Sequence, residues 1–316
     1  MWLIIGHLGA EVSLCVVRES ALRPMKCYIV AQIGILMKYL TFLLVLLSST
    51  TWAKPLIVTS IHPLTMIVTA IAGDAAEVRQ LLPNTAEPHH YALRISDRAL
   101  LNQANLIVWT GPELETFLTR TIASQDPEKV ITATALADIE GAKLTESNDP
   151  HIWLNPHNGI VIATETSNWI AAHHPALRES ILARQQQFRA AVLTVSDRIS
   201  KQLHPHGKAK ILVDHDGFGH FFSAFNIRQA GALKSPSGLS LSAGKLHNLL
   251  AEGEFDCIAT EPRSAHNRVN NIASAVDTPT VSIDSHGADI PASATAYTEL
   301  LEEIATALAS CLSPQR

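Results

Sequence analysis

Short apolar runs alternate with helical stretches along most of the chain. In the first half, β-branched and apolar runs predict strands at residues 55–61, 77–82, 106–110 and 130–134. Between them, helical spacing predicts helices up to about residue 72, near Ser96, which is expected to act as the cap, and from about residue 113. Strands that alternate with helices are typical of a parallel α/β sheet.

The longest periodic segment extends from about residue 176 to residue 203 and contains no glycine or proline. Its apolar residues recur at helical spacing, at Leu177, Ile181, Phe188, Val192, Val195 and Ile199. The alternation then resumes, with strands predicted at residues 211–213, 227–230, 257–260 and 280–283 and helices near residues 217–225, 242–251, 265–275 and 293–310.

We therefore predict an α/β fold of two lobes, each with a mostly parallel sheet flanked by helices, joined by one long connecting helix. The N-terminal lobe is expected at residues 54–175, the connecting helix at 176–204 and the C-terminal lobe at 205–316. In such sheets, ligands bind beyond the carboxyl ends of the strands, and two lobes offer a crevice between them.

Residues 37–53 have the pattern of a secretory signal peptide. A methionine and a lysine precede an apolar run of about eight residues, which is too short to span a bilayer, and Thr51-Trp52-Ala53 forms an acceptable cleavage site. A permanent N-terminal anchor is the alternative. Because residues 1–36 lie upstream of a complete signal, we expect them to be a non-native extension, with Met37 as the start and Met25 as the other option.

Composition limits the classes of protein that remain. The chain has 316 residues, which is more than one ordinary hydrophobic core accommodates. Of these residues 47% are hydrophobic and 17% are charged, and this composition excludes a disordered chain. A formal net charge of −5 disfavours sequence-independent binding to nucleic-acid phosphates. Fifteen histidines are dispersed along the chain.

The cysteines agree with export. Cys257 and Cys311 are the two that remain once the N-terminal segments are removed, and an even pair in an oxidising compartment favours one disulfide. The alternative is that Cys257, in an apolar strand, is a buried thiol.

Three loop histidines are candidate metal ligands. His89 follows the second predicted strand, His151 precedes a helix, and His215 ends the first strand of the second lobe, while Asp284 ends another strand there. Three imidazoles with a carboxylate or water would fill the tetrahedral shell of zinc. Each histidine alone is more often solvated, and the chain has no His-Glu-x-x-His or Cys-x-x-Cys motif. Spacing alone therefore leaves the metal site open.

Several motifs resemble those of a known family. The sequence looks like the periplasmic zinc-binding component of bacterial high-affinity zinc ABC importers, in a wider family of metal receptors that includes manganese receptors and streptococcal adhesins. The matching stretches occur in order along residues 55–312: Ser60-Ile61-His62-Pro63-Leu64, Leu82-Pro83, His89-x-Tyr91-x-Leu93-Arg94-x-Ser96-Asp97, Asp149-x-His151-x-Trp153-Leu154, Val213-x-His215-Asp216-x-Phe218-Gly219, Glu261-Pro262 and Asp284.

The resemblance implies a site and a function. It implies that His89, His151 and His215 bind Zn(II), and that Asp284 matches a carboxylate that completes the site in some members and gives way to water in others. It also implies a disulfide between Cys257 and Cys311 and a rigid connecting helix. The protein would be a monomer in the periplasm that captures Zn(II) between its lobes and delivers it to an inner-membrane ABC permease with its cytoplasmic ATPase, and it would not be an enzyme.

Supporting residues and departures from the family are also expected. Glu261 would orient a ligand by accepting an imidazole N–H, whereas His62 would either support a ligand or have a local structural role. Pro88 stands where some zinc receptors have a glutamate ligand, and we expect the neighbouring His90 to face solvent. Residues 119–148 contain no histidine, so the capture loop of many zinc receptors is missing.

Two alternative functions remain open. A manganese receptor or adhesin could share the fold, but His215 provides nitrogen where manganese receptors have a carboxylate, which favours zinc. A zinc-dependent hydrolase could also use three histidines and a water. No glutamate lies at the short helical spacing of a metallopeptidase base, which disfavours the hydrolase.

Overall fold

The structure is a computed structural model that describes residues 2–8, 11–17, 54–141, 149–251, 253–262 and 266–313. It divides into two units, Met1–Ala53 and Lys54–Arg316. In the first unit, β1 (Trp2–Leu8) pairs with β2 (Glu11–Val17) in an antiparallel ladder. The signal peptide expected at residues 37–53 lies outside the described residues. Within the described ranges, no helix is both long and apolar enough to cross a membrane.

The first sheet of the second unit is parallel, in the order β4-β3-β5-β6. Its strands are β3 (Leu56–Thr59), β4 (Glu77–Gln80), β5 (Leu106–Trp109) and β6 (Val130–Thr132). All four residues of β5 are buried, as expected for a strand that is covered on both faces and therefore reads as a continuous apolar run. The helices α2 (His62–Ala72) and α3 (Ile95–Gln103) connect these strands.

Two helix starts differ from the sequence-based prediction. Ser96 lies inside α3 rather than at its cap, because the helix is capped at Arg94, whose N–H donates to Asp97 Oδ2 at 2.8 Å. The helix expected from about residue 113 is reduced to a 3₁₀ turn, Thr116–Leu118, and the short α4 (Thr119–Ile122).

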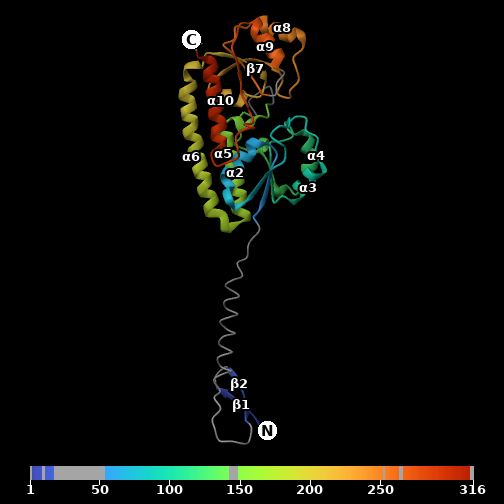
Figure 1. Cartoon of the computed structure of the whole chain (residues 1–316), viewed down its shortest axis with the longest axis vertical. Helices are drawn as coiled ribbons and strands as arrows, with labels where there is room; N and C mark the ends of the chain where they lie inside the picture. The colour runs from blue at the N-terminus through green and yellow to red at the C-terminus, as the bar shows by residue number, and fades with distance from the viewer. Residues whose placement is uncertain are drawn as a thin grey trace. The chain divides into compact units, whose positions relative to one another are not determined.

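The second sheet is also parallel, in the order β10-β9-β7-β8. Its strands are β7 (Lys210–His215), β8 (Arg228–Lys234), β9 (Cys257–Thr260) and β10 (Thr280–Ser282). Three helices lie between the strands, namely α7 (Gly219–Ala224), α8 (Ala243–Ala251) and α9 (His266–Ala275). This sheet and the first one confirm the predicted two-lobe α/β architecture (Figure 1).

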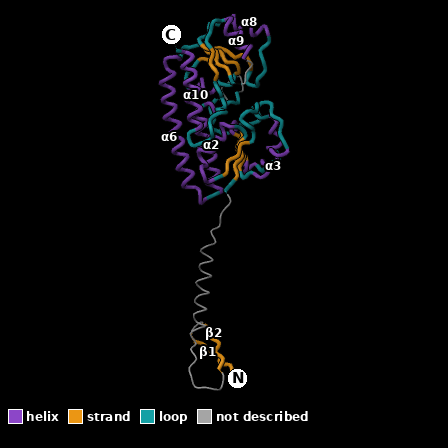
Figure 2. Tube along the Cα trace, viewed as in Figure 1, coloured by secondary structure: helices purple, strands orange, loops and turns teal. Residues whose placement is uncertain are grey.

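Long helices connect the two sheets along one side of this unit (Figure 2). The helix α5 (Pro156–His173) follows the first sheet, and α6 (Arg178–Leu203) is the predicted connecting helix. Its buried stripe contains Ile181, Phe188, Val192, Val195, Ile199 and Leu203. The last helix, α10 (Ala296–Leu312), packs against α6 and α2 and also against β9 and β10. It therefore contacts both lobes.

The expected disulfide is confirmed. Cys257 in β9 is bonded to Cys311 in α10, with the two Cα atoms 5.9 Å apart. Cys257 is fully buried, but the bond rules out the alternative that it is a buried free thiol. The bond anchors α10 to the second sheet.

Candidate metal centre

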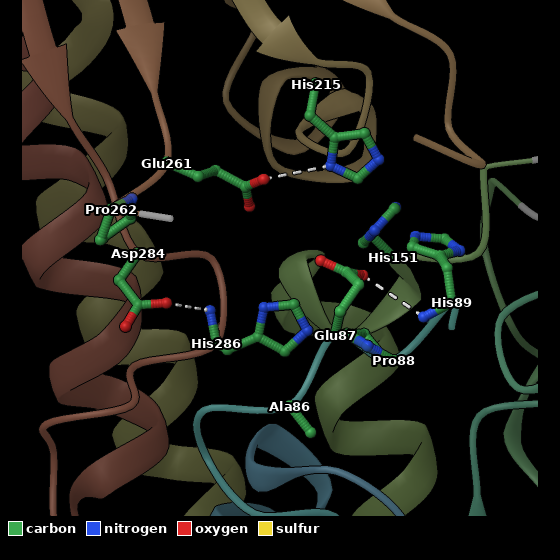
Figure 3. Close-up of a pocket in the computed structure, with 10 residues that line it drawn as sticks. All are labelled: Ala86, Glu87, Pro88, His89, His151, His215, Glu261, Pro262, Asp284 and His286. Carbon is green, nitrogen blue, oxygen red and sulfur yellow. Dashed lines mark hydrogen bonds and ion pairs between the residues drawn. The ribbon is translucent and has the colours of Figure 1, made fainter. Parts of the chain in front are cut away.

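Three histidines from distant parts of the sequence meet at one point (Figure 3). Their nearest ring nitrogens all lie within 4.8 Å of one another. The ring centroids are separated by 5.5 Å for His89 and His151, 5.6 Å for His89 and His215, and 4.9 Å for His151 and His215. Zinc binds imidazole nitrogen at ~2.0–2.1 Å, so small inward rotations of these rings would bring all three nitrogens onto one ion.

The sheet topology explains why these residues converge. His215 is the last residue of β7, Glu261 follows its neighbour β9, and Asp284 follows β10, which pairs with β9. In the first lobe, the loop that leaves the carboxyl end of β4 contains His89. Because the carboxyl ends of parallel strands share one edge, these loops face the same crevice.

His151 is held from behind by a carboxylate. Asp149 Oδ1 accepts both the backbone N–H of His151, at 3.0 Å, and its ring Nδ1–H, at 2.7 Å. Two effects on the pKa of Asp149 oppose each other. Burial alone would raise the pKa, but the interaction with His151 is stronger and holds the pKa below its usual value. His220 Nε2 donates to the carbonyl oxygen of Asp149 at 2.9 Å. Since Nδ1 of His151 carries the proton, its Nε2 has the lone pair that a metal requires.

His215 is held at both ring nitrogens. Its Nδ1 lies 3.3 Å from Glu261 Oε2, and its Nε2 donates to the carbonyl oxygen of Pro236 at 3.0 Å. Burial lowers the pKa of His215, but the hydrogen bond to Glu261 outweighs burial, so the pKa lies above 6.5. Glu261 thus has the contact expected of an orienting carboxylate. A cation that binds this ring displaces a proton.

His89 has the opposite protonation behaviour. Burial, followed by the nearby rings of His151 and His215, lowers its pKa to about 3. Its Nε2 is buried and has no hydrogen-bond partner within the described part of the chain. The backbone N–H of His89 donates to Glu87 Oε1 at 3.3 Å. A buried neutral imidazole with an unpaired nitrogen is suited to bind a metal ion.

The cavity around the histidines is small and contains several acidic groups. It has a volume of about 40 Å³, and the residues that line it include Glu87, Glu261 and Asp284. By this measure one water molecule needs roughly 10–15 Å³, so the cavity has room for an ion and a few water molecules. A neighbouring cavity of about 170 Å³ shares His89, His215 and Glu261 with it. Figure 3 shows the Glu87 carboxylate directed into this space.

Asp284 lines the same cavity, but its carboxylate is engaged elsewhere. Its Oδ1 accepts the backbone N–H of His286 at 2.9 Å, and its Oδ2 accepts that of Ala288 at 2.7 Å. Among the described residues, the group whose ligand atoms lie within 4.8 Å of one another contains the three histidines and not Asp284. The expectation that Asp284 binds the metal therefore remains a prediction, which the positions of its carboxylate oxygens do not support.

His62 and His90 lie away from the three rings. The ring nitrogens of His62 contact Gln80 Oε1 at 2.7 Å and the carbonyl oxygen of Ile290 at 2.8 Å. These contacts favour the local structural role that was the alternative for His62, because they join α2 to β4 and to the loop at Ile290. His90 is exposed, as expected.

Sequence reasoning assigned no role to three residues at the centre. Asp149 lies two residues before His151, and this Asp-x-His spacing is the signal that could have revealed it. Pro88 stands where some zinc receptors have a glutamate ligand, and the residue before it, Glu87, carries its carboxylate into the cavity. His286, which also lines the cavity, gave no sequence signal.

Comparisons with known proteins agree with this arrangement. A family described as the periplasmic component A of zinc-uptake complexes, ZnuA, matches residues 57–311. The high-affinity zinc uptake system protein ZnuA of Haemophilus ducreyi is 28% identical over 306 residues, covering 85% of this chain and 97% of that protein. The protein of the same name from Yersinia pestis is 27% identical over 292 residues, covering 82% and 92%.

Solved structures share the fold. The periplasmic zinc-binding protein TroA from Treponema pallidum superposes with a TM-score of 0.73 at 20% identity, covering 83% of this chain and 100% of that chain. A crystal structure of ZnuA superposes with a TM-score of 0.71 at 24% identity, covering 82% and 99%. At these identities the likeness supports the two-lobe fold alone. The family match spans nearly the whole of the second unit, and the chain therefore belongs to the family of periplasmic component A of zinc-uptake complexes.

Proposed function

We propose that this protein captures Zn(II) in the periplasm and delivers it to an inner-membrane ABC permease. The observation that carries the proposal is the convergence of His89, His151 and His215 within 4.8 Å of one another. Membership in a zinc-uptake family and the names of the relatives support the same function.

The donor set favours zinc over manganese. Imidazole nitrogen suits zinc, copper and nickel, whereas carboxylate and water oxygens suit manganese. All three clustered donors are nitrogens, and the ring of His89 is already neutral at pH 7 because its pKa is lowered to about 3. Copper(II) would bind these ligands at least as tightly in vitro, so the cargo must be identified in the cell.

The family disfavours the hydrolase alternative. A catalytic zinc needs an open coordination position and space for the substrate beside it. The cavity at the three histidines is small, about 40 Å³, although a cavity of about 170 Å³ adjoins it. Membership in a family of zinc-uptake components therefore supports transport over hydrolysis.

The test measures metal content and affinity. Protein purified from the periplasm should contain one equivalent of zinc. His89→Ala, His151→Ala and His215→Ala should each weaken zinc binding strongly in competition titrations with a chelator, because each variant removes one donor. His204→Ala is the matched control, since His204 is exposed at the end of α6 and should leave the affinity unchanged.

Two outcomes would contradict the proposal. The first is that all three variants hold one equivalent of zinc with unaltered affinity, which would place the metal elsewhere. The second is hydrolysis of esters or peptides that disappears with His151→Ala, which would favour the enzyme. Crosslinking of the zinc-loaded protein to a permease in the inner membrane tests the delivery step separately.

A further inference from the structure

The loop after β10 brings a fourth imidazole to the cavity. Asp284 accepts the backbone N–H groups of His286 and Ala288, at 2.9 and 2.7 Å, and these bonds fold the chain back on itself. Gly287, with φ of +61°, provides the left-handed conformation that the turn requires. As a result, the His286 side chain lines the cavity (Figure 3). The carboxylate of Asp284 therefore stabilises the loop, and the loop positions the His286 ring at the cavity.

One tryptophan links this ring to the three-histidine group. The ring of Trp153 lies 5.2 Å, between centroids, from the ring of His286 and 5.2 Å from that of His151. Its Nε1–H donates to the carbonyl oxygen of Ser285 at 2.9 Å. Trp153 is fully buried, so it forms a fixed wall against which both imidazoles are positioned.

The hydrogen bonds of Ser285 define the proton on His286. Ser285 Oγ donates its only proton to Glu261 Oε1 at 2.6 Å, because an ionised carboxylate can only accept. The other oxygen of this carboxylate, Glu261 Oε2, lies 3.3 Å from His215 Nδ1, where it accepts a ring N–H. The 3.0 Å contact between Ser285 Oγ and His286 Nδ1 therefore has Nδ1–H as the donor. In the neutral form of His286, the lone pair is then on Nε2, and this is the form that binds metals.

We propose that His286 Nε2 is the fourth zinc ligand and that Asp284 positions the loop instead of binding the ion. This inference rests on the proposed function, since it completes the same site. His286 lies outside the group of three mutually close histidines, so its side chain must rotate toward them when the ion binds. A shell of four imidazoles favours zinc over manganese more strongly than three imidazoles and a carboxylate do.

The test counts imidazole ligands on the bound ion. Zinc X-ray absorption of the full protein should show the scattering of four imidazole rings, and of three in His286→Leu and His286→Asn. Leucine fills the apolar space beside Trp153, whereas asparagine keeps polarity, so agreement between the two variants excludes a packing artefact. We expect both to retain one equivalent of zinc with affinity weakened by about tenfold or more, the order of change known for residues around metal sites.

Asp284→Asn is the matched comparison. The asparagine retains one oxygen acceptor for the loop, so the variant should keep four imidazole rings on the ion. The inference is overturned if His286→Leu leaves the spectrum and affinity unchanged, or if Asp284→Asn removes an oxygen ligand while the ring count stays at three. His151→Ala separates the two proposals. Loss of zinc in that variant with no effect of His286→Leu overturns only the inference, whereas unaltered zinc binding in both overturns the proposed function as well.

Discussion

At the residue scale, the centre combines histidines with different protonation behaviour. His89 is neutral because burial and neighbouring rings lower its pKa to about 3, whereas the contact with Glu261 keeps the pKa of His215 above 6.5. Glu261 therefore has two effects on a cation. Its charge attracts the ion, but its hydrogen bond to His215 stabilises the protonated ring, whose proton the ion must displace.

Zinc affinity should fall as the pH is lowered from about 7.5 to 5.5. Protonated His215 cannot bind the ion, and its pKa is raised, so the loss begins at a higher pH than for a free imidazole. Well below that pKa, one displaced proton corresponds to about tenfold in affinity per pH unit. Chelator-competition titrations across this range measure the effect.

Glu261→Gln tests the cause of this pH dependence. Without the carboxylate the pKa of His215 should fall, so affinity should begin to decline at a lower pH than in the wild type. Glu113→Gln is the control, because Glu113 is exposed and contacts Thr134 away from the cavity. An affinity that is constant between neutral pH and pH 5 would contradict the binding of zinc by three imidazoles.

At the element scale, α6 connects the lobes through one apolar stripe. Phe188 is 5% exposed, and its ring centroid lies 5.6 Å from that of Tyr297 in α10. Leu193, on the opposite face of the same helix, is 48% exposed. The helix thus has one buried face and one solvated face, as its 3.6-residue periodicity predicts.

Phe188→Ala should lower the free energy of unfolding by about 3–5 kcal/mol, because it removes a buried aromatic ring and leaves a cavity. Leu193→Ala should change the free energy of unfolding by about 0.5 kcal/mol or less, since that side chain is largely solvated and leucine and alanine have similar helix propensities. Denaturant unfolding of both variants measures the difference. Equal losses in the two variants would show that the stripe does not contribute the stability assigned to it.

At the scale of the whole molecule, the two lobes share structural elements. The hydroxyl of Tyr297 in α10 donates to the carbonyl oxygen of Trp153 at 2.7 Å, and the Cys257–Cys311 disulfide fastens the other end of α10 to β9. The same helix therefore contacts the segment around Trp153 in the first lobe and the sheet of the second lobe. This arrangement opposes a hinge motion between the lobes.

Zinc binding should therefore leave the radius of gyration unchanged within experimental error. Small-angle scattering of the protein with and without zinc measures it, and His151→Ala with added zinc is the control for non-specific effects. A clear decrease on binding, of the kind that hinged receptors show, would contradict a rigid connection. The movement that we expect on binding is limited to side chains such as His286.

The periodicity of apolar residues was sufficient for the architecture. Both sheets and the connecting helix agree with the prediction, because burial on a strand or a helix imposes a local repeat. Helix starts were less predictable. Arg94 caps α3 through its backbone, which no preference for cap residues would select.

By itself, the sequence determined the two-lobe fold and named His89, His151 and His215 as candidate ligands. Only the tertiary structure decided which neighbours face them. Asp284 follows a strand as predicted, but backbone N–H groups from its own loop occupy its carboxylate, while His286, Glu87 and Asp149 enter the centre. The physical reason is that loop side chains have no repeat. Their direction depends on turns and hydrogen bonds that form only when distant strands bring the loops together.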